Sequence, residues 1–286
     1  MKLIKQSFEI LEQKDFTIKG IKQFVERCAR VSYKSEDKIT DTSYEKFVGI
    51  LESRDHARPL EFGTVHLKMI LPDFQGFMNS LLTLGILNDI WIKSTYVGDI
   101  IYITTNYRYY LDITKHLPNV REYFTEEDNE YYPKRYTVHM ILDRGVMDEF
   151  RTHVGLSHLA ESTRYCNYSK DKFGNELTFI DPCWEIRTAN ERITPEGTHV
   201  SSDALEFLTA LNEAEDHYLS LLAKGWTPQQ ARSVLPLGIK SELISCGFED
   251  SWENFFKRRD APDAHPMAQE IAKPMHEEFS KLVNSH

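Results

Sequence analysis

Residues 100–110 read Ile-Ile-Tyr-Ile-Thr-Thr-Asn-Tyr-Arg-Tyr-Tyr, a run of β-branched and aromatic side chains. Such side chains favour extended backbone because they pack well on a pleated surface, so this run is the strongest strand prediction in the chain. Residues 64–69, which alternate, and residues 136–142 predict two more strands. The acidic stretch between them, residues 125–130, is expected to form a solvated surface turn.

Helices are predicted on both sides of these strands. Residues 21–29 and 203–223 carry apolar side chains at helical spacing, and Gly225 just after the second is typical of a helix end. The last third of the chain, including residues 252–259, has mainly helical character. Because strands and helices are interleaved before it, we expect a single α/β (α+β) domain with a mixed or antiparallel sheet.

Two capping boxes are predicted at helix starts. Thr42 with Glu45 three residues later fits the first of them. The second is Thr227-Pro228-Gln229-Gln230, which combines a threonine cap, a proline at the first helical position and a closing glutamine. The helix that follows is expected to end just before Pro236.

Composition excludes several classes of protein. The 286 residues include 34 Lys and Arg against 44 Asp and Glu, a net charge of −10. A field of that sign opposes general binding to nucleic acids and anionic membranes, although a small basic pocket for one mononucleotide stays compatible. No apolar run approaches the roughly 18 residues that span a bilayer, and the first residues do not resemble a signal peptide. Four widely spaced cysteines without a CxxC pair are typical of reduced thiols, so we expect a cytoplasmic protein.

Several common site motifs are absent from the sequence. It contains no GxGxxG, GxxxxGK[ST] or GxSxG pattern, which leaves Gly-rich phosphate loops and a hydrolase nucleophile without support. It also contains no HExxH pattern and no Cys/His cluster. His153 and His158 are five residues apart, a spacing that does not place two side chains on one helical face. We therefore expect no metal site.

One dense polar region, residues 151–168, follows a strand and a turn at Asp143-Arg144-Gly145. An arginine at such a turn is suited to bind phosphate or carboxylate through a fork of N–H groups. A surface helix whose arginines pair with nearby acids explains the region equally well. Arg232 and Arg259 lie in two further segments, and three separate arginine-bearing segments in an acidic chain indicate convergence on an anionic ligand. Ion pairs remain the simpler explanation of any single arginine-bearing segment.

Seven short motifs occur along the chain in an order that resembles one protein family. They are Cys28-Ala29-Arg30-Val31-Ser32, Pro59-Leu60-Glu61, Ser162-Thr163-Arg164-Tyr165, Ala231-Arg232-Ser233-Val234-Leu235-Pro236-Leu237, Asn254-Phe255, Arg259 and Ala268-Gln269-Glu270-Ile271. In this order they resemble the flavin-dependent thymidylate synthase family, with gaps, from about residue 27 to about residue 274. Each motif alone is weak, but the whole order is specific.

The resemblance implies a mixed sheet with a long-helix bundle and a homotetramer that binds FAD across subunit interfaces. The implied reaction carries a one-carbon unit from methylenetetrahydrofolate to C5 of dUMP, with NADPH as reductant, and gives dTMP. A close variant of this chemistry ends at 5-hydroxymethyl-dUMP. The alternative from another class is a non-catalytic nucleotide-binding paralogue that has lost its flavin site.

The resemblance also assigns site residues by position. Those implied to bind dUMP are Glu149, Glu161, Ser162, Arg164, Arg232 and Arg259, with Ser162 and Arg259 as the catalytic pair. Those implied to bind FAD are Ser32, Arg58, Arg151, Thr152, His153 and Asn254. Arg259 is expected to lie against the pyrimidine carbonyl, where a fixed positive charge stabilises negative charge that develops on the ring.

The chain departs from the family pattern in ways that affect the flavin site. The family's Arg-His-Arg falls on Thr152-His153-Val154, so both arginines are missing, and Arg151 stands one residue early. Phe62 and Phe248 stand where a histidine and an asparagine are common.

Residues 70–132 form an insertion relative to compact family members. Two roles are compatible with Arg108 within it: a place near the pocket and, as the favoured expectation, a strand residue that pairs with a surface acid.

Overall fold

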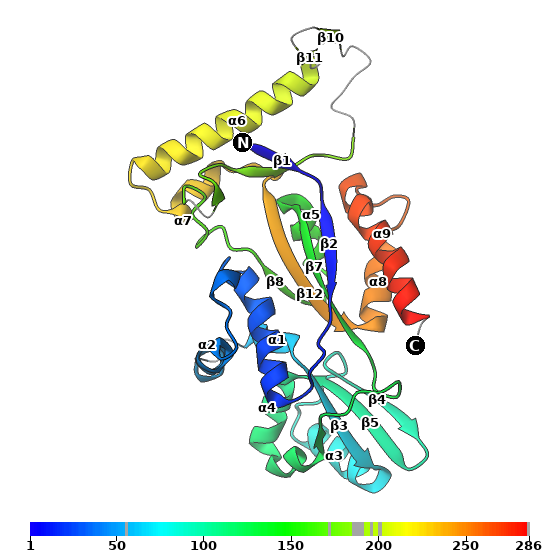
Figure 1. Ribbon diagram of the computed structural model, residues 1–286. Helices are drawn as coiled ribbons and strands as arrows, with labels where there is room; N and C mark the ends of the chain where they lie inside the picture. The colour runs from blue at the N-terminus through cyan, green and yellow to red at the C-terminus, as the bar shows by residue number, and fades with distance from the viewer. Residues whose placement is uncertain (55–56, 171–172, 185–191, 195–196, 200–201, 285–286) are drawn as a thin grey trace.

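The computed structural model describes residues 1–54, 57–170, 173–184, 192–194, 197–199 and 202–284. Within these residues the chain forms two four-stranded antiparallel sheets at different levels of the molecule, with a long helix, α6 (Ser202–Ala223), at the end opposite the second sheet (Figure 1). This arrangement confirms the predicted α/β class and its antiparallel sheet.

The first sheet has the strand order β2 (Ser7–Leu11), β7 (Arg135–Asp143), β12 (Lys240–Phe248) and β8 (Ser157–Ala160). Strand β12 is buried almost throughout because helices cover both faces of the sheet. Leu243 packs with α8 (Glu249–Arg259) and α9 (Pro266–Val283), whereas Ile244 and Cys246 pack with α1 (Ile18–Val31). This alternation follows from the two-residue repeat of a strand and produces two separate cores.

The second sheet has the order β4 (Ile92–Val97), β5 (Ile100–Asn106), β3 (Thr64–Ile70) and β6 (Phe124–Thr125). Together with α3 (Leu71–Thr83) and α4 (Tyr107–His116) it occupies most of the stretch expected to be an insertion. The remaining elements are β1 (Lys2–Ile4), η1 (Glu36–Lys38), α2 (Ser43–Ser53), η2 (Arg58–Phe62), η3 (Pro118–Tyr123), α5 (Arg144–Phe150), β9 (Thr178–Ile180), β10 (Arg192–Thr194), β11 (Gly197–His199), α7 (Pro228–Ala231) and η5 (Arg232–Val234).

Most of the predicted elements are confirmed. Residues 21–29 lie in α1, residues 64–69 in β3, residues 136–142 in β7 and residues 252–259 in α8. Gly225 has a φ of 92° just after α6, and Gln230 Oε1 accepts from the backbone N–H of Thr227 at 2.9 Å to close the second capping box. Leu205, expected on the apolar side of α6, is 59% exposed.

Two local predictions are wrong. The strand predicted for residues 100–110 ends at Asn106, whose side chain accepts from the backbone N–H of Tyr109 at 2.9 Å and caps α4. The tyrosines that favoured a strand pack in the core from a helix instead, because tertiary packing overrides their weak local preference. The Thr42 side chain makes no capping bond, since Thr40 and Ser43 bond each other at the start of α2.

Within the described ranges, no helix is both long and apolar enough to cross a membrane.

Candidate active site

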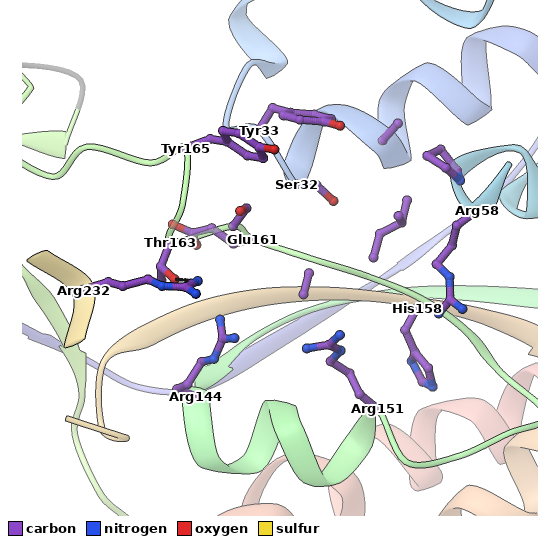
Figure 2. A pocket seen from close by; sticks show the side chains of 15 residues that line it. Ser32, Tyr33, Arg58, Arg144, Arg151, His158, Glu161, Thr163, Tyr165 and Arg232 are labelled. Carbon is purple, nitrogen blue, oxygen red and sulfur yellow. Dashed lines mark hydrogen bonds between the residues drawn. The ribbon is translucent and has the colours of Figure 1, made fainter. Parts of the chain in front are cut away.

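A cavity of about 290 Å³ opens beside the first sheet (Figure 2). Its walls come from the end of α1, from η2, from both ends of α5, from η5 and from the segment that begins in β8. The lining residues are Ala29, Ser32, Tyr33, Arg58, Pro59, Arg144, Arg151, His158, Leu159, Ala160, Glu161, Ser162, Thr163, Tyr165 and Arg232.

Helix α5 contributes two of the four arginines. Arg144 is its first residue and Arg151 its C-cap, seven residues later, so two helical turns place both on one face. The backbone N–H of Arg144 donates to the carbonyls of Leu237 and Ile239 at 2.9 and 3.1 Å, which anchors the start of the helix. Both guanidinium groups also approach the half-exposed Asp148, at 3.6 and 3.4 Å.

The other two arginines enter from opposite sides of the cavity, Arg58 from η2 and Arg232 from η5 (Figure 2). In the part of the chain that the structure describes, neither lies within 4.0 Å of a carboxylate; Arg232 donates only to Thr163 Oγ1, at 3.3 Å. The cavity therefore carries uncompensated positive charge inside a protein whose net charge is −10. Such a site attracts an anionic ligand.

Glu161 is the one acid of the lining, and it is only 1% exposed. Its Oε1 accepts from the hydroxyl of Tyr168 at 3.1 Å and its Oε2 from Lys240 Nζ at 2.9 Å. Lys240, outside the cavity, also pairs with the buried Glu242, so it balances the charge of Glu161 only in part. The four arginines of the lining still outnumber this single acid.

Two serines meet at the cavity wall. The backbone N–H of Ser162 donates to the carbonyl of Ser32 at 3.1 Å. This bond joins the matched motif at residues 162–165, which we call the signature segment, to the end of α1. The hydroxyl of Ser32 is buried and has no hydrogen-bond partner among the described residues. Buried hydroxyls are almost always bonded, so Ser32 is placed to bond a ligand.

His158 and His153 form a short chain behind the arginines. His158 Nε2 lies 3.1 Å from the carbonyl oxygen of His153 and must donate to it, so its Nδ1 accepts from Ser245 Oγ at 2.8 Å. His153 Nε2 accepts from Arg259 Nε at 2.9 Å. Burial lowers the pKa of both rings to about 4, helped at His153 by the charge of Arg259. Both histidines are therefore neutral near pH 7.

Arg259 lies outside the cavity lining and binds one turn of the chain. Its Nη1 donates to Glu149 Oε2 at 2.8 Å, and its Nη2 donates to the Glu149 carbonyl and to Thr152 Oγ1 at 2.9 and 3.2 Å. With His153, these residues form what we name the Arg259 cluster (Glu149, Thr152, His153 and Arg259). It holds the turn that carries Arg151.

The structure thus separates the predicted site residues into groups. Six of them meet at the cavity: Ser32, Arg58, Arg151, Glu161, Ser162 and Arg232. Four belong to the Arg259 cluster. Arg164 donates to Gln229 Oε1 at 3.0 Å, and Asn254 is exposed on α8. The roles assigned to all of these residues remain predictions.

Several lining residues are not identified as site residues by the sequence. The sequence places Arg144 only in a turn, although its position directly after a predicted strand is a signal for the first residue of a helix. Tyr33 directly follows one matched motif and Tyr165 is the last residue of another, and their ring centroids lie 5.8 Å apart at the cavity (Figure 2).

Three other predictions can be compared with the structure. Arg108 lies on α4 rather than on a strand. Its Nη1 contacts the buried Glu61 at 2.6 Å, and its Nε also lies 4.0 Å from Oδ2 of the surface acid Asp112. Phe62 and Phe248, at positions where the family often has polar residues, are both core side chains. Among the described residues, no three His, Cys, Asp or Glu side chains are arranged to hold a metal ion.

Comparison with known proteins gives the family. The thymidylate synthase complementing protein family matches residues 134–283, which hold α5, β8, the signature segment, β12 and α8. The chain belongs to this family. Membership supports an enzyme that acts on dUMP in nucleotide metabolism.

Two solved structures of the UMP/dUMP methylase PolB from Streptomyces cacaoi are similar to this chain. The one bound with 5-Br dUMP is 17% identical, with a TM-score of 0.44 over 99% of this chain and 93% of that one. The one bound with 5-Br UMP is 16% identical, with a TM-score of 0.44 over 99% and 92%. No curated protein matches the sequence.

Proposed function

We propose that this chain is a flavin-dependent thymidylate synthase, which transfers a one-carbon unit from methylenetetrahydrofolate to C5 of dUMP and gives dTMP. The observation that carries the proposal is the cavity, where residues predicted for dUMP and residues predicted for FAD line one positively charged space. FAD, when bound, supplies the redox chemistry of the reaction, and NADPH and the folate are co-substrates.

In this proposal dUMP binds on the side of Ser162, Glu161 and Arg232. Arg232, together with Arg144, holds the phosphate, because neither guanidinium is fully satisfied by protein acceptors. The volume of about 290 Å³ is near the lower end of small-molecule sites, roughly 300–1,000 Å³, and suits one mononucleotide. Only part of FAD can therefore share this space, and the rest of the cofactor would lie outside the cavity of one chain.

FAD binds in this proposal on the side of Ser32, Arg58 and Arg151. The residues present fit the group: the buried Ser32 hydroxyl lacks a partner and Arg58 lacks a carboxylate among the described residues, so both are available to acceptor atoms of the cofactor. The lining also supplies the positive charge that the two missing motif arginines would provide. Thr152 is engaged by Arg259, and Val154 is 83% exposed, so Arg58 and Arg151 take over the positive charge.

Oligomerisation accounts for the predicted site residues that lie outside the cavity. Arg164, Asn254 and the Arg259 cluster do not line the cavity within one chain. In a homotetramer with shared sites, neighbouring copies would complete the uracil contact assigned to Arg259. We place the enzyme in the cytoplasm, with no nucleic-acid or membrane partner.

Tritium release from 5-tritiated dUMP tests the proposal. Purified protein with FAD, methylenetetrahydrofolate and NADPH should release tritium and give dTMP, and the protein should have an oxidised-flavin absorbance band. The changed motif at Thr152 and Val154 keeps one alternative open, since it alters the flavin surroundings: a 5-hydroxymethyl-dUMP product would identify a hydroxymethylase. A colourless protein that takes up no FAD and releases no tritium would be a non-catalytic paralogue.

A further inference from the structure

A buried carboxylate joins the second sheet to the wall of the cavity. Glu61, on η2, is 4% exposed. Arg108 Nη1, on α4, donates to its Oε1 at 2.6 Å, and Ser157 Oγ, on β8, donates to its Oε2 at 2.6 Å. We call these three residues the Glu61 bridge.

The backbone around Glu61 is held from a third direction. Arg135, on β7, donates through Nη2 to the carbonyl of Glu61 at 2.7 Å and through Nη1 to the carbonyl of Gly63 at 3.1 Å. The guanidinium of Arg108 is itself fixed, because it lies over the Trp91 ring with its Cζ 4.9 Å from the ring centroid. Both the side chain and the backbone of η2 are therefore tied to other elements.

Two lining residues of the cavity depend on this arrangement. Arg58 lies three residues before Glu61 in the same short helix, and His158 follows Ser157 directly in β8 (Figure 2). Arg58 lies close enough to His158 to help lower the pKa of that ring, although burial has the larger effect. Arg58 extends into the cavity from η2, so the position of the η2 backbone sets where its side chain enters.

We propose that Arg108 and Glu61 are positioning residues, through which the second sheet sets Arg58 in the anion site. Neither residue lines the cavity. The identity of the anion rests on the proposed function, but the positioning role does not. Arg108 acts through Glu61 and Arg58, so its effect on binding should vanish once Arg58 is gone.

The test measures binding of pyrophosphate, a probe of the anion site that needs no flavin chemistry, and of FAD, by calorimetry. Arg108→Met should weaken both by about tenfold, on the scale of one lost charge-assisted hydrogen bond. Lys115→Met is the matched control, because it removes another cation of α4 that pairs with the surface acid Asp112, at 3.1 Å. Asp112 also lies 4.0 Å from Arg108 Nε, so the contact with Glu61 is what Arg108→Met removes and the control keeps. The control should change neither affinity by more than about twofold.

A double-mutant cycle tests whether Arg108 acts through Arg58. The variant that carries both Arg108→Met and Arg58→Met should bind pyrophosphate no more weakly than Arg58→Met alone. Full additivity would overturn the proposal, and so would unchanged binding in Arg108→Met or a wild-type protein that binds no pyrophosphate. Wild-type binding of pyrophosphate without turnover of dUMP would instead overturn the proposed function and leave the positioning role standing.

Folding needs its own control, because removal of Arg108 leaves a buried carboxylate unpaired. Combining Arg108→Met with Glu61→Gln removes that charge and keeps a side-chain oxygen for the Ser157 hydroxyl. This pair should fold, by circular dichroism, and should show the same loss of affinity. If it folds and binds pyrophosphate as tightly as the wild-type protein, the bridge does not position Arg58.

Discussion

Arg232→Gln separates binding from stability more cleanly than any other change in the cavity. Arg232 is exposed and makes a single hydrogen bond, to Thr163 Oγ1 at 3.3 Å, with no carboxylate within ion-pair distance among the described residues. Its replacement should alter the free energy of unfolding by no more than about 0.5 kcal/mol. If it binds the phosphate of dUMP, one charge-assisted hydrogen bond of about 1.5–3 kcal/mol is lost, which weakens dUMP binding by about 10- to 100-fold.

Calorimetric titrations with dUMP and with deoxyuridine, at one fixed ionic strength, test this prediction. Deoxyuridine lacks the phosphate, so its affinity should change by less than about twofold in Arg232→Gln. Lys115→Gln serves as the control for the loss of a surface cation, and thermal unfolding of each variant reports stability. Equal loss of affinity for both ligands, or no loss for dUMP, would refute the assignment of Arg232 to the phosphate.

Three further predictions follow from the site and its surroundings. Arg259→Ala should abolish tritium release and should lower the melting temperature, because it removes four hydrogen bonds to residues 149–153, while unfolding stays cooperative; undiminished turnover would defeat the assignment of Arg259. Arg151→Ala should weaken FAD more than dUMP in binding titrations, and the opposite order would contradict its flavin assignment. His66 is stacked between Phe16 and Tyr132 at 4.4 and 4.0 Å, and burial lowers its pKa to about 4. As the pH falls from 6.5 toward 4 the unfolded chain gains a proton that the folded ring does not bind, so His66 lowers stability by up to about 1.4 kcal/mol per pH unit. His153 and His158, whose pKa is also lowered to about 4, contribute with the same sign, so His66→Phe should reduce the slope but not abolish it in urea denaturation at pH 7 and pH 5; an unchanged slope would show that His66 does not contribute.

The spacing of apolar residues predicts an element of this fold correctly where it follows a single helical or strand period. Residues 21–29 satisfy the helical pattern in every apolar position, and residues 136–142 alternate at Tyr136, Val138, Met140 and Leu142. Both segments belong to the core. The strand prediction for residues 107–110 is wrong because aromatic side chains favour strands in general. The deciding contact is the Asn106 side chain, which caps a helix at this point.

The site could be predicted only in part for a related reason. Ser162 and Arg232 belong to matched motifs and Glu161 directly precedes one, so the sequence alone identifies all three as candidates. The approach of Arg58 and Arg144 to them depends on how η2 and α5 pack, which no spacing reveals. The pairing of Arg108 with Glu61, 47 residues apart, likewise needs the three-dimensional fold.

A crystal structure of the protein with dUMP would decide whether the arginine-lined cavity is the nucleotide site. We expect density for the phosphate within hydrogen-bond distance of Arg144 and Arg232, with the rest of the nucleotide beside Ser162. Density for dUMP on another surface, with this cavity holding only water, would contradict it.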